Sequence, residues 1–207
     1  MVKACLFDLD GVVFDTEPLY TLFWRNLDKK LRPNIDNFEH VIKGQTLVQI
    51  YDKYFTGEEE KQKEITTILY EYERNMSFNY ITGFELFIKE LRSKGIKTAV
   101  VTSSNLAKMQ NVYNKHHEFK GYFNEILTSE DFAESKPSPD CYLKAAARFG
   151  VSPEDCVVFE DSFNGLRSGI ASGARVIGLA TTNSVAELKP YTEEIISNYD
   201  GFTLSDH

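Results

Sequence analysis

Two kinds of hydrophobic pattern alternate along most of the chain. Short continuous apolar runs, rather than alternating ones, are typical of strands covered on both faces of a sheet. Between them, apolar residues recur at helical spacing. The runs predict strands at 4–7, 98–101, 125–128, 156–159 and 175–179, with helices at 84–94, 106–114, 139–149 and after 160 through 172. Strand and helix in alternation predict an α/β fold, a Rossmann-like, doubly wound parallel sheet.

One segment departs from this alternation. From Glu17 to Phe78 the apolar residues recur at helical spacing, as in Leu19, Phe23 and Leu27, and strand signals are few. This segment separates the first predicted strand from the others. We therefore expect a sheet domain formed by residues 1–16 and 79–207, interrupted by a small inserted α-helical domain at 17–78.

Composition narrows the class of protein. The 207 residues include 42% hydrophobic and 26% charged residues, and the net charge is −8. A chain this acidic without a basic stripe is a poor nucleic-acid binder. The three cysteines, Cys5, Cys141 and Cys156, form no CxxC pair. With neither a signal peptide nor a long apolar run, we expect a cytoplasmic protein with no membrane segment.

Polar residues follow three of the predicted strands. Asp8 and Asp10 follow the first, Thr102 to Ser104 the second, and Glu160 with Asp161 a later one. Because ligands bind outside the carboxyl ends of strands in open α/β sheets, these side chains are expected to converge. Clustered carboxylates need a cation, and their oxygen ligands suit Mg²⁺. Lys136, in a turn rich in proline and serine, adds a positive charge.

These groups suit phosphoryl transfer. A carboxylate can attack phosphorus to form an acyl phosphate, and a second carboxyl can protonate the leaving oxygen and then activate water. Mg²⁺ and a lysine would neutralise the phosphoryl oxygens. The alternatives without catalysis are a turn cap at Asp8 and Asp10, a helix N-cap within Thr102 to Asn105, and an ordinary loop lysine at Lys136.

Four motifs resemble those of the haloacid dehalogenase superfamily. They occur in order and frame nearly the whole chain: Asp8-Leu9-Asp10-Gly11, Thr102-Ser103-Ser104-Asn105, Lys136-Pro137-Ser138-Pro139 and Phe159-Glu160-Asp161-Ser162. The chain most resembles the branch with a helical cap, which holds β-phosphoglucomutase and the small sugar-phosphate and phosphoglycolate phosphatases. The inserted segment 17–78 would then be a cap that closes over the site.

The resemblance implies a role for each motif residue. Asp8 would be the nucleophile and a metal ligand, and Asp10 the general acid/base, with its backbone carbonyl on Mg²⁺. Thr102, Ser103 and Ser104 would bind the phosphoryl group, and Lys136 would stabilise it. Asp161 would ligate Mg²⁺. For Glu160, direct ligation and a supporting role behind the ligands are both open.

The same resemblance separates the reactions. Dehalogenases of the superfamily lack the second aspartate of the first motif, so Asp10 favours phosphoryl transfer. Mutases carry Lys-Gly-x-x-Arg in the cap, whereas this chain has Lys43-Gly44-Gln45-Thr46-Leu47. Leu47 in place of the arginine favours a substrate with one phosphate, and Lys43 and Gln45 remain candidate cap contacts with the substrate.

We therefore expect a Mg²⁺-dependent phosphatase, a monomer that hydrolyses small phosphorylated metabolites such as sugar or polyol phosphates through a phosphoaspartate. Two alternatives stay open: a β-phosphoglucomutase-like phosphotransferase, and a binding module that has lost the chemistry.

Overall fold

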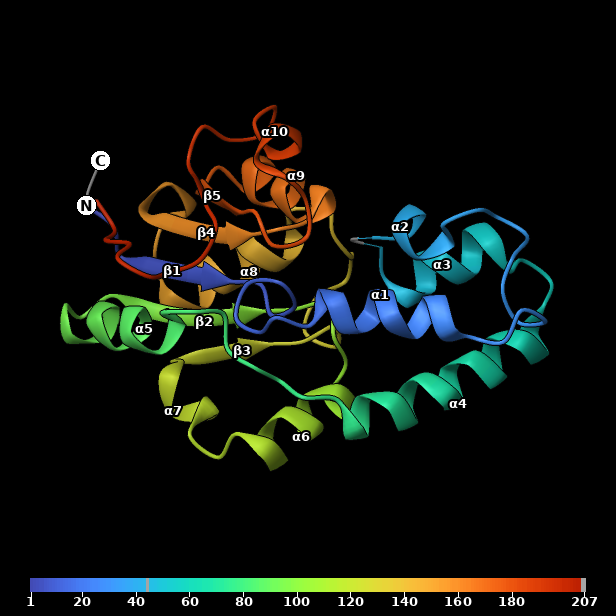
Figure 1. Ribbon diagram of the computed structural model, residues 1–207. Coiled ribbons are helices and arrows are strands. Elements are labelled where there is room, and N and C mark those ends of the chain that lie inside the picture. Colours follow the sequence, from blue (N-terminus) through green and yellow to red (C-terminus); the bar gives the residue numbers. More distant parts are fainter. Residues whose placement is uncertain (44, 206–207) are drawn as a thin grey trace.

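A parallel sheet forms the centre of the molecule. The structure is a computed structural model that describes residues 1–43 and 45–205 (Figure 1). Within these residues the strands pair in the order β3-β2-β1-β4-β5-β6, and every pair is parallel. Their bounds are β1 Ala4–Phe7, β2 Lys97–Val101, β3 Glu125–Leu127, β4 Cys156–Glu160, β5 Arg175–Leu179 and β6 Ile195–Ile196. The predicted doubly wound α/β fold is confirmed.

Helices connect the strands and cover the sheet. The segment between β1 and β2 holds α1 Glu17–Asn26, α2 Phe38–Val41, α3 Leu47–Tyr54, α4 Glu59–Asn75 and α5 Phe84–Ser93. The later connections hold α6 Leu106–Lys115, α7 Phe119–Tyr122, α8 Asp140–Phe149, α9 Phe163–Ser172 and α10 Val185–Leu188, with a 3₁₀ turn at Pro153–Asp155.

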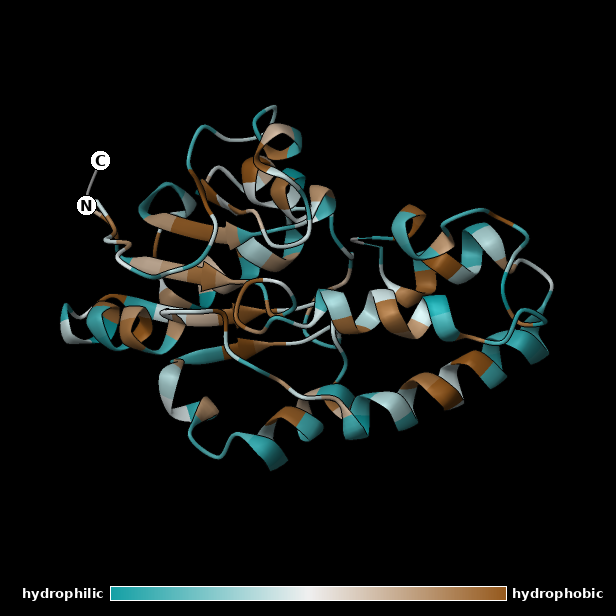
Figure 2. Cartoon of the chain, viewed as in Figure 1, coloured by the Kyte–Doolittle hydropathy of each residue, from teal (hydrophilic) through white to brown (hydrophobic). Residues whose placement is uncertain are grey.

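Each face of the sheet has its own apolar core. Helices α5, α6 and α7 cover one face, where Phe7 of β1 stacks on Phe159 of β4 with ring centroids 4.6 Å apart. Helices α8, α9 and α10 cover the other face, with Tyr142 among its fully buried side chains. The strands β1 and β4 are mostly tan to brown in Figure 2, which fits burial on both faces. This continuous burial explains why the strands are recognisable in the sequence as apolar runs.

The helices α1 to α4 lie together beyond the carboxyl ends of the strands (Figure 1). They enclose a third apolar core of their own, centred on Trp24, Phe38, Phe55 and Ile65. Their alternating bands of hydropathy fit helices with one buried face (Figure 2).

The elements that the sequence did not predict are short. They are β6, α2, α7, α10 and the 3₁₀ turn, each two to four residues long. Elements of this length are too short to show a hydrophobic periodicity in the sequence. The longer predicted elements agree with the structure within a few residues at each end. In the described ranges, no helix combines the length and the apolar character needed to cross a membrane.

Candidate active site

Lys136 joins the carboxyl ends of three strands. Its Nζ lies 2.6 Å from Asp8 Oδ1 after β1, 3.0 Å from the carbonyl oxygen of Val101 in β2, and 2.7 Å from Glu160 Oε1 in β4. The side chain is only 5% exposed. Asp8 and Glu160, which are far apart in the sequence, are therefore brought together as the convergence of strand ends predicted, and Lys136 bonds to both.

Glu160 lies behind this pair and is fully buried. Besides Lys136, the Tyr142 hydroxyl donates to its Oε1 at 2.7 Å, and the backbone N–H of Asp161 donates to Oε2 at 3.1 Å. Gly165 leaves room for the carboxylate, since a Cβ there would lie 1.9 Å from Glu160 Oε1. Both oxygens of Glu160 thus accept hydrogen bonds within the protein.

Asp161 lies on the open side of the cluster. Its Oδ2 accepts from the hydroxyl of Thr182, and its carbonyl accepts from Asn183 Nδ2 at 2.9 Å. A Cβ at Gly11, whose φ is +73°, would lie 2.2 Å from Asp161 Oδ2. Glycine at position 11 therefore lets the chain after β1 turn back against this carboxylate.

Three carboxylates share this small volume. Asp8, Glu160 and Asp161 each offer one oxygen, and these oxygens lie within 4.8 Å of one another. Burial raises the pKa of Asp8 to about 7; Lys136 opposes the shift, while Glu160 and Asp10 add to it. Burial and Glu160 also raise the pKa of Asp161 well above its ordinary value. Carboxylates that resist ionisation together fit a hard divalent cation such as Mg²⁺, which favours their charged forms.

Lys136 is the positive charge that the protein itself supplies. Burial opposes its charged form, but Asp8 and Glu160 raise its pKa well above the ordinary value. When all three carboxylates are ionised, this one lysine leaves the cluster with an excess of negative charge. A divalent cation would therefore complete the charge balance of this site.

The second predicted motif borders the same site. Thr102 follows β2 and is 1% exposed; its Oγ1 accepts from the backbone N–H of Ser104 at 3.0 Å. Asn105 caps α6 by accepting from the N–H of Lys108 at 2.9 Å. The helix cap considered from the sequence is therefore present. Thr102, Ser103 and Ser104 all line the cavity described below.

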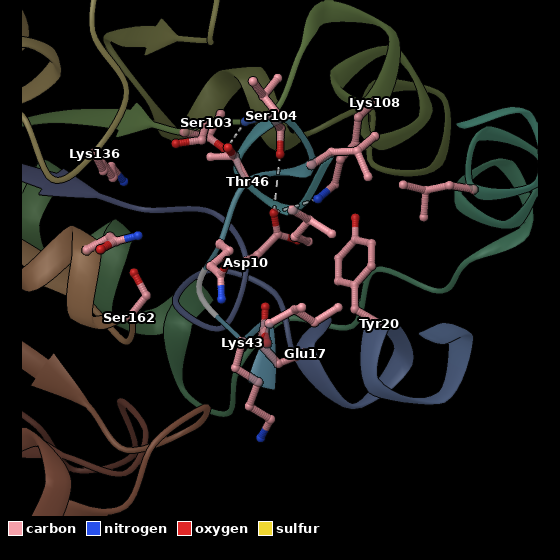
Figure 3. Close-up of a pocket in the computed structure, with 18 of the residues that line it drawn as sticks. Asp10, Glu17, Tyr20, Lys43, Thr46, Ser103, Ser104, Lys108, Lys136 and Ser162 are labelled. Carbon is pink, nitrogen blue, oxygen red and sulfur yellow. Dashed lines mark hydrogen bonds and ion pairs between the residues drawn. The ribbon is translucent and has the colours of Figure 1, made fainter. Parts of the chain in front are cut away.

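Asp10 turns away from the carboxylate cluster. Thr16 Oγ1 donates to its Oδ1 at 2.6 Å, Ser104 Oγ donates to its Oδ2 at 3.2 Å, and Lys108 Nζ lies 2.5 Å from Oδ2 (Figure 3). Figure 3 shows Lys136 well apart from this group. The structure thus gathers three of the four carboxylates that the sequence placed in one volume, and it pairs the fourth with Lys108.

A cavity of about 380 Å³ opens between these strand ends and the helices α1, α3 and α4. Asp8, Asp10, Asp161 and Lys136 line it from the sheet side. Its size is within the usual range for a small-molecule site.

The predicted cap contacts also border the cavity. Lys43 donates from Nζ to the carbonyl oxygen of Thr182 at 3.2 Å, whereas Gln45 donates from Nε2 to Val41 within its own segment at 2.9 Å. Gly44, between them, lies outside the described residues. Gln49, which the sequence did not single out, donates to the carbonyl oxygen of Lys136 at 3.1 Å.

The motifs that build this site match a known family. Residues 2–173 match the haloacid dehalogenase-like hydrolases. The chain belongs to this family. The predicted family is confirmed, and so is the prediction that the chain is a hydrolase.

Two relatives extend the match over most of this haloacid dehalogenase-like hydrolase. A protein of Drosophila melanogaster named probable pseudouridine-5'-phosphatase is 28% identical over 219 residues, covering 97% of this chain and 91% of the relative. Hexitol phosphatase A of Escherichia coli is 29% identical over 182 residues, covering 86% and 82%. A crystal structure of a haloacid dehalogenase hydrolase from Entamoeba histolytica superposes with a TM-score of 0.85 at 26% identity, covering 98% and 96%.

Sequence reasoning missed several residues of the site in this hydrolase. Thr182 and Asn183 follow β5, so the same rule of strand ends would have found them. Lys108 lies in the first turn of α6, three residues after the N-cap Asn105, and so begins close to the loop of the second motif. Tyr20 and Glu73, on the helical wall, had no comparable signal because polar positions on a helix usually face solvent.

Proposed function

We propose that the protein is a Mg²⁺-dependent phosphatase that hydrolyses small phosphate monoesters, with sugar or polyol phosphates as substrates, through a phosphoaspartate on Asp8. The proposal rests on one observation above all. A carboxylate that lines the cavity, Asp8, is held by a buried lysine 2.6 Å away and adjoins the carboxylates of Glu160 and Asp161.

Asp8, Asp161 and the backbone carbonyl of Asp10 would hold the metal. Glu160, whose oxygens accept bonds from Lys136, Tyr142 and the backbone, would position the lysine from behind. When bound, Mg²⁺ would neutralise phosphoryl oxygens and favour the ionised nucleophile.

In the first half-reaction, an oxygen of Asp8 forms a bond to phosphorus while the bond from phosphorus to the leaving oxygen breaks. Protonated Asp10 gives its proton to that leaving oxygen, which departs as an alcohol. Lys136 and the Thr102–Ser104 loop hold the phosphoryl oxygens as their charge redistributes. Ser104 already donates to Asp10, so the loop contacts both reacting groups.

In the second half-reaction, water attacks the phosphorus of the phosphoaspartate. Asp10, now ionised, takes a proton from the water as the bond from phosphorus to Asp8 breaks. Inorganic phosphate leaves, Asp8 is restored as a carboxylate, and Asp10 is again protonated. One residue thus serves as acid and then as base.

We propose residues 17–78 as the cap that selects the alcohol, and residues 1–16 and 79–207 as the catalytic domain. Hydrolysis is favoured over phosphotransfer to a second site because Leu47 lines the cavity where the mutase pattern has an arginine. The names of the relatives, a pseudouridine-5'-phosphatase and a hexitol phosphatase, support a sugar-like alcohol. A monomeric state and a cytoplasmic location stay predictions.

The test is phosphate release from sugar, polyol and nucleoside monophosphates in the presence of Mg²⁺. Strong release from a few of these esters, removed by EDTA, is expected. Asp8→Asn removes the nucleophile with little change in volume, so it should lower turnover by roughly 10³-fold or more. Asp36→Asn, in an exposed loop, is the matched control and should retain the wild-type rate.

Three outcomes would contradict the proposal. Retention of activity in Asp8→Asn would remove this residue from the mechanism. Isomerisation of a sugar phosphate without net phosphate release would identify a mutase. An absence of both Mg²⁺ affinity and turnover would indicate a binding module.

A further inference from the structure

The wall of the cavity opposite Lys136 holds a buried polar group that the reaction scheme does not use. Lys108 of α6 is 6% exposed, and its ammonium lies 4.7 Å from the centre of the Tyr20 ring. The Tyr20 hydroxyl donates to Glu73 Oε1 at 2.8 Å, and Glu73 is also 6% exposed. Glu17 lines the same wall beside Lys43 (Figure 3). These residues face the part of the cavity that the leaving alcohol would fill.

The charges on this wall do not balance. Lys108 is paired with Asp10, and Glu39 is paired with Arg25 at 3.1 Å. Among the described residues that line the cavity, this leaves Glu17 and Glu73 against Lys43. The wall therefore carries an excess of acidic groups beyond those that the phosphoryl centre uses.

Both of these glutamates resist ionisation, chiefly because they are buried. Burial, together with Asp10, raises the pKa of Glu17 to about 7, opposed by Lys108 and Lys43. Burial also raises the pKa of Glu73, with Lys108 and the Tyr20 hydroxyl opposing the shift. A region where carboxyl groups already resist ionisation disfavours a further negative charge in the ligand.

A positive charge in the ligand is not favoured either. The Lys108 ammonium lies over the Tyr20 ring, and together with Lys43 it opposes a further positive charge on this wall. What remains are oxygen acceptors, a hydroxyl and an ammonium along a wall that also includes the apolar surface of Trp24, Leu47 and Leu69. Such a surface suits an uncharged ligand with several hydroxyl groups.

We infer that Glu17, Tyr20 and Glu73 are specificity-determining residues that select an uncharged, polyhydroxylated leaving group and reject alcohols that carry a second phosphate or a carboxylate. This inference rests on the proposed phosphatase function and sharpens it. It predicts that the discrimination lies in the helices α1 and α4 rather than in the strand-end loops.

Three six-carbon ligands that differ only at carbon 1 provide the test. Sorbitol 6-phosphate carries an alcohol there, 6-phosphogluconate a carboxylate, and 1-amino-1-deoxysorbitol 6-phosphate an amine. Binding is measured by calorimetry with Mg²⁺ and full-length Asp8→Asn, which holds the ligands without turnover. Sorbitol 6-phosphate is expected to bind roughly tenfold more tightly than 6-phosphogluconate, and more tightly than the amine.

Variants then locate the discrimination. Glu73→Gln keeps an acceptor for the Tyr20 hydroxyl but removes the charge, and Glu17→Gln removes the other charge. On the Asp8→Asn background, each should narrow the preference for the alcohol over the carboxylate by roughly threefold or more. Glu64→Gln, on the exposed face of α4, should leave that preference unchanged.

Several results would overturn the inference: no binding of sorbitol 6-phosphate, tighter binding of the carboxylate or the amine, or equal preferences in Glu73→Gln and Glu64→Gln. Phosphate release by the wild type from sorbitol 6-phosphate tests the phosphatase function separately. If release fails while the binding preferences hold, the proposed function is wrong and the selectivity stands. If release succeeds while the preferences fail, only the inference is wrong.

Discussion

The sheet side and the helical side of the cavity are built in different ways. On the sheet side, Asp8 and Glu160 are cross-linked by Lys136, which also binds a carbonyl of β2. On the helical side, long side chains such as Lys43 and Gln49 each reach the sheet side through one bond to a carbonyl oxygen. The carboxylates on the sheet side are therefore fixed by strand geometry, whereas the opposite wall reaches the sheet side through single long side chains.

This difference suggests that the sheet side carries the reaction and the helical side selects the substrate. Side chains at strand ends can be held to a fraction of an ångström, which transfer of a phosphoryl group requires. A wall of helices with its own apolar core can change its polar residues without disturbing the sheet. We expect substitutions on the sheet side to affect turnover or metal binding, and those on the helical side to affect affinity and selectivity with little change in turnover.

Lys136→Met should show the largest effect. It leaves Asp8 and the buried Glu160 without their cation, at a cost of about 3–5 kcal/mol in the free energy of unfolding. Turnover should fall by roughly 10²–10³-fold because the phosphoryl oxygens lose a positive charge. Thermal melting and steady-state kinetics measure both. Lys144→Met, exposed on α8, is the control. If the two variants have the same melting temperature and the same turnover, Lys136 does not stabilise the carboxylates or the phosphoryl group as proposed.

Asp161→Asn tests the contribution of one proposed metal ligand on the sheet side. Since its pKa is raised well above the ordinary value, the neutral amide should be tolerated in the metal-free fold. Millimolar Mg²⁺ should raise the melting temperature of the wild type, and the variant should need at least roughly tenfold more Mg²⁺ for the same rise. Melting curves with Mg²⁺ and with EDTA test this. An unchanged Mg²⁺ response would exclude Asp161 as a ligand.

On the helical side, Glu17 should give stability a dependence on pH. Its pKa in the folded chain, about 7, lies above the ordinary 4.5, so folding retains a proton that the unfolded chain has lost. Its contribution to stability is present below about 4.5 and is lost as pH rises through about 7. Metal-free Glu17→Gln should therefore gain a few degrees in melting temperature relative to the wild type over this range. A constant difference would show that Glu17 does not titrate as described.

The predicted cap contacts should show the smallest effects. Lys43→Met loses the bond to the carbonyl of Thr182 and a charge on the cavity wall, so KM should rise by roughly three- to fivefold with little change in kcat. Gln45→Ala loses a bond that stays within its own segment and should change KM by less than about twofold. A large fall in kcat for either variant would contradict the expectation that substitutions on the helical side affect affinity and not turnover.

The same division explains how far the sequence could be interpreted. Apolar runs located the strands, and the rule that ligands bind at strand ends then gathered Asp8, Glu160 and Asp161 correctly in space. Lys136 was placed beside them by its motif. Their roles stay predictions. The residues that α1, α3 and α4 contribute to the cavity could not be predicted, because helical periodicity identifies only the apolar face of a helix.

Glu73 illustrates this limit. It occupies a polar position on α4 and would be interpreted as solvated, yet it is 6% exposed and bonded to Tyr20. The orientation of Asp10 was hidden for a related reason. Its side chain turns with the loop after β1 toward Lys108 in α6, and only the tertiary packing of that helix places the lysine there.

The ion pair between Asp8 and Lys136 spans 128 positions of the chain. A ribosome therefore adds Asp8 long before it adds the lysine that pairs with it, and every intermediate length of nascent chain carries Asp8 without that partner. The segment with Lys136 also precedes β4, which supplies Glu160 and Asp161. Charge balance at the centre thus arrives only when most of the polypeptide has emerged, so a nascent or truncated chain lacks the assembled reaction centre.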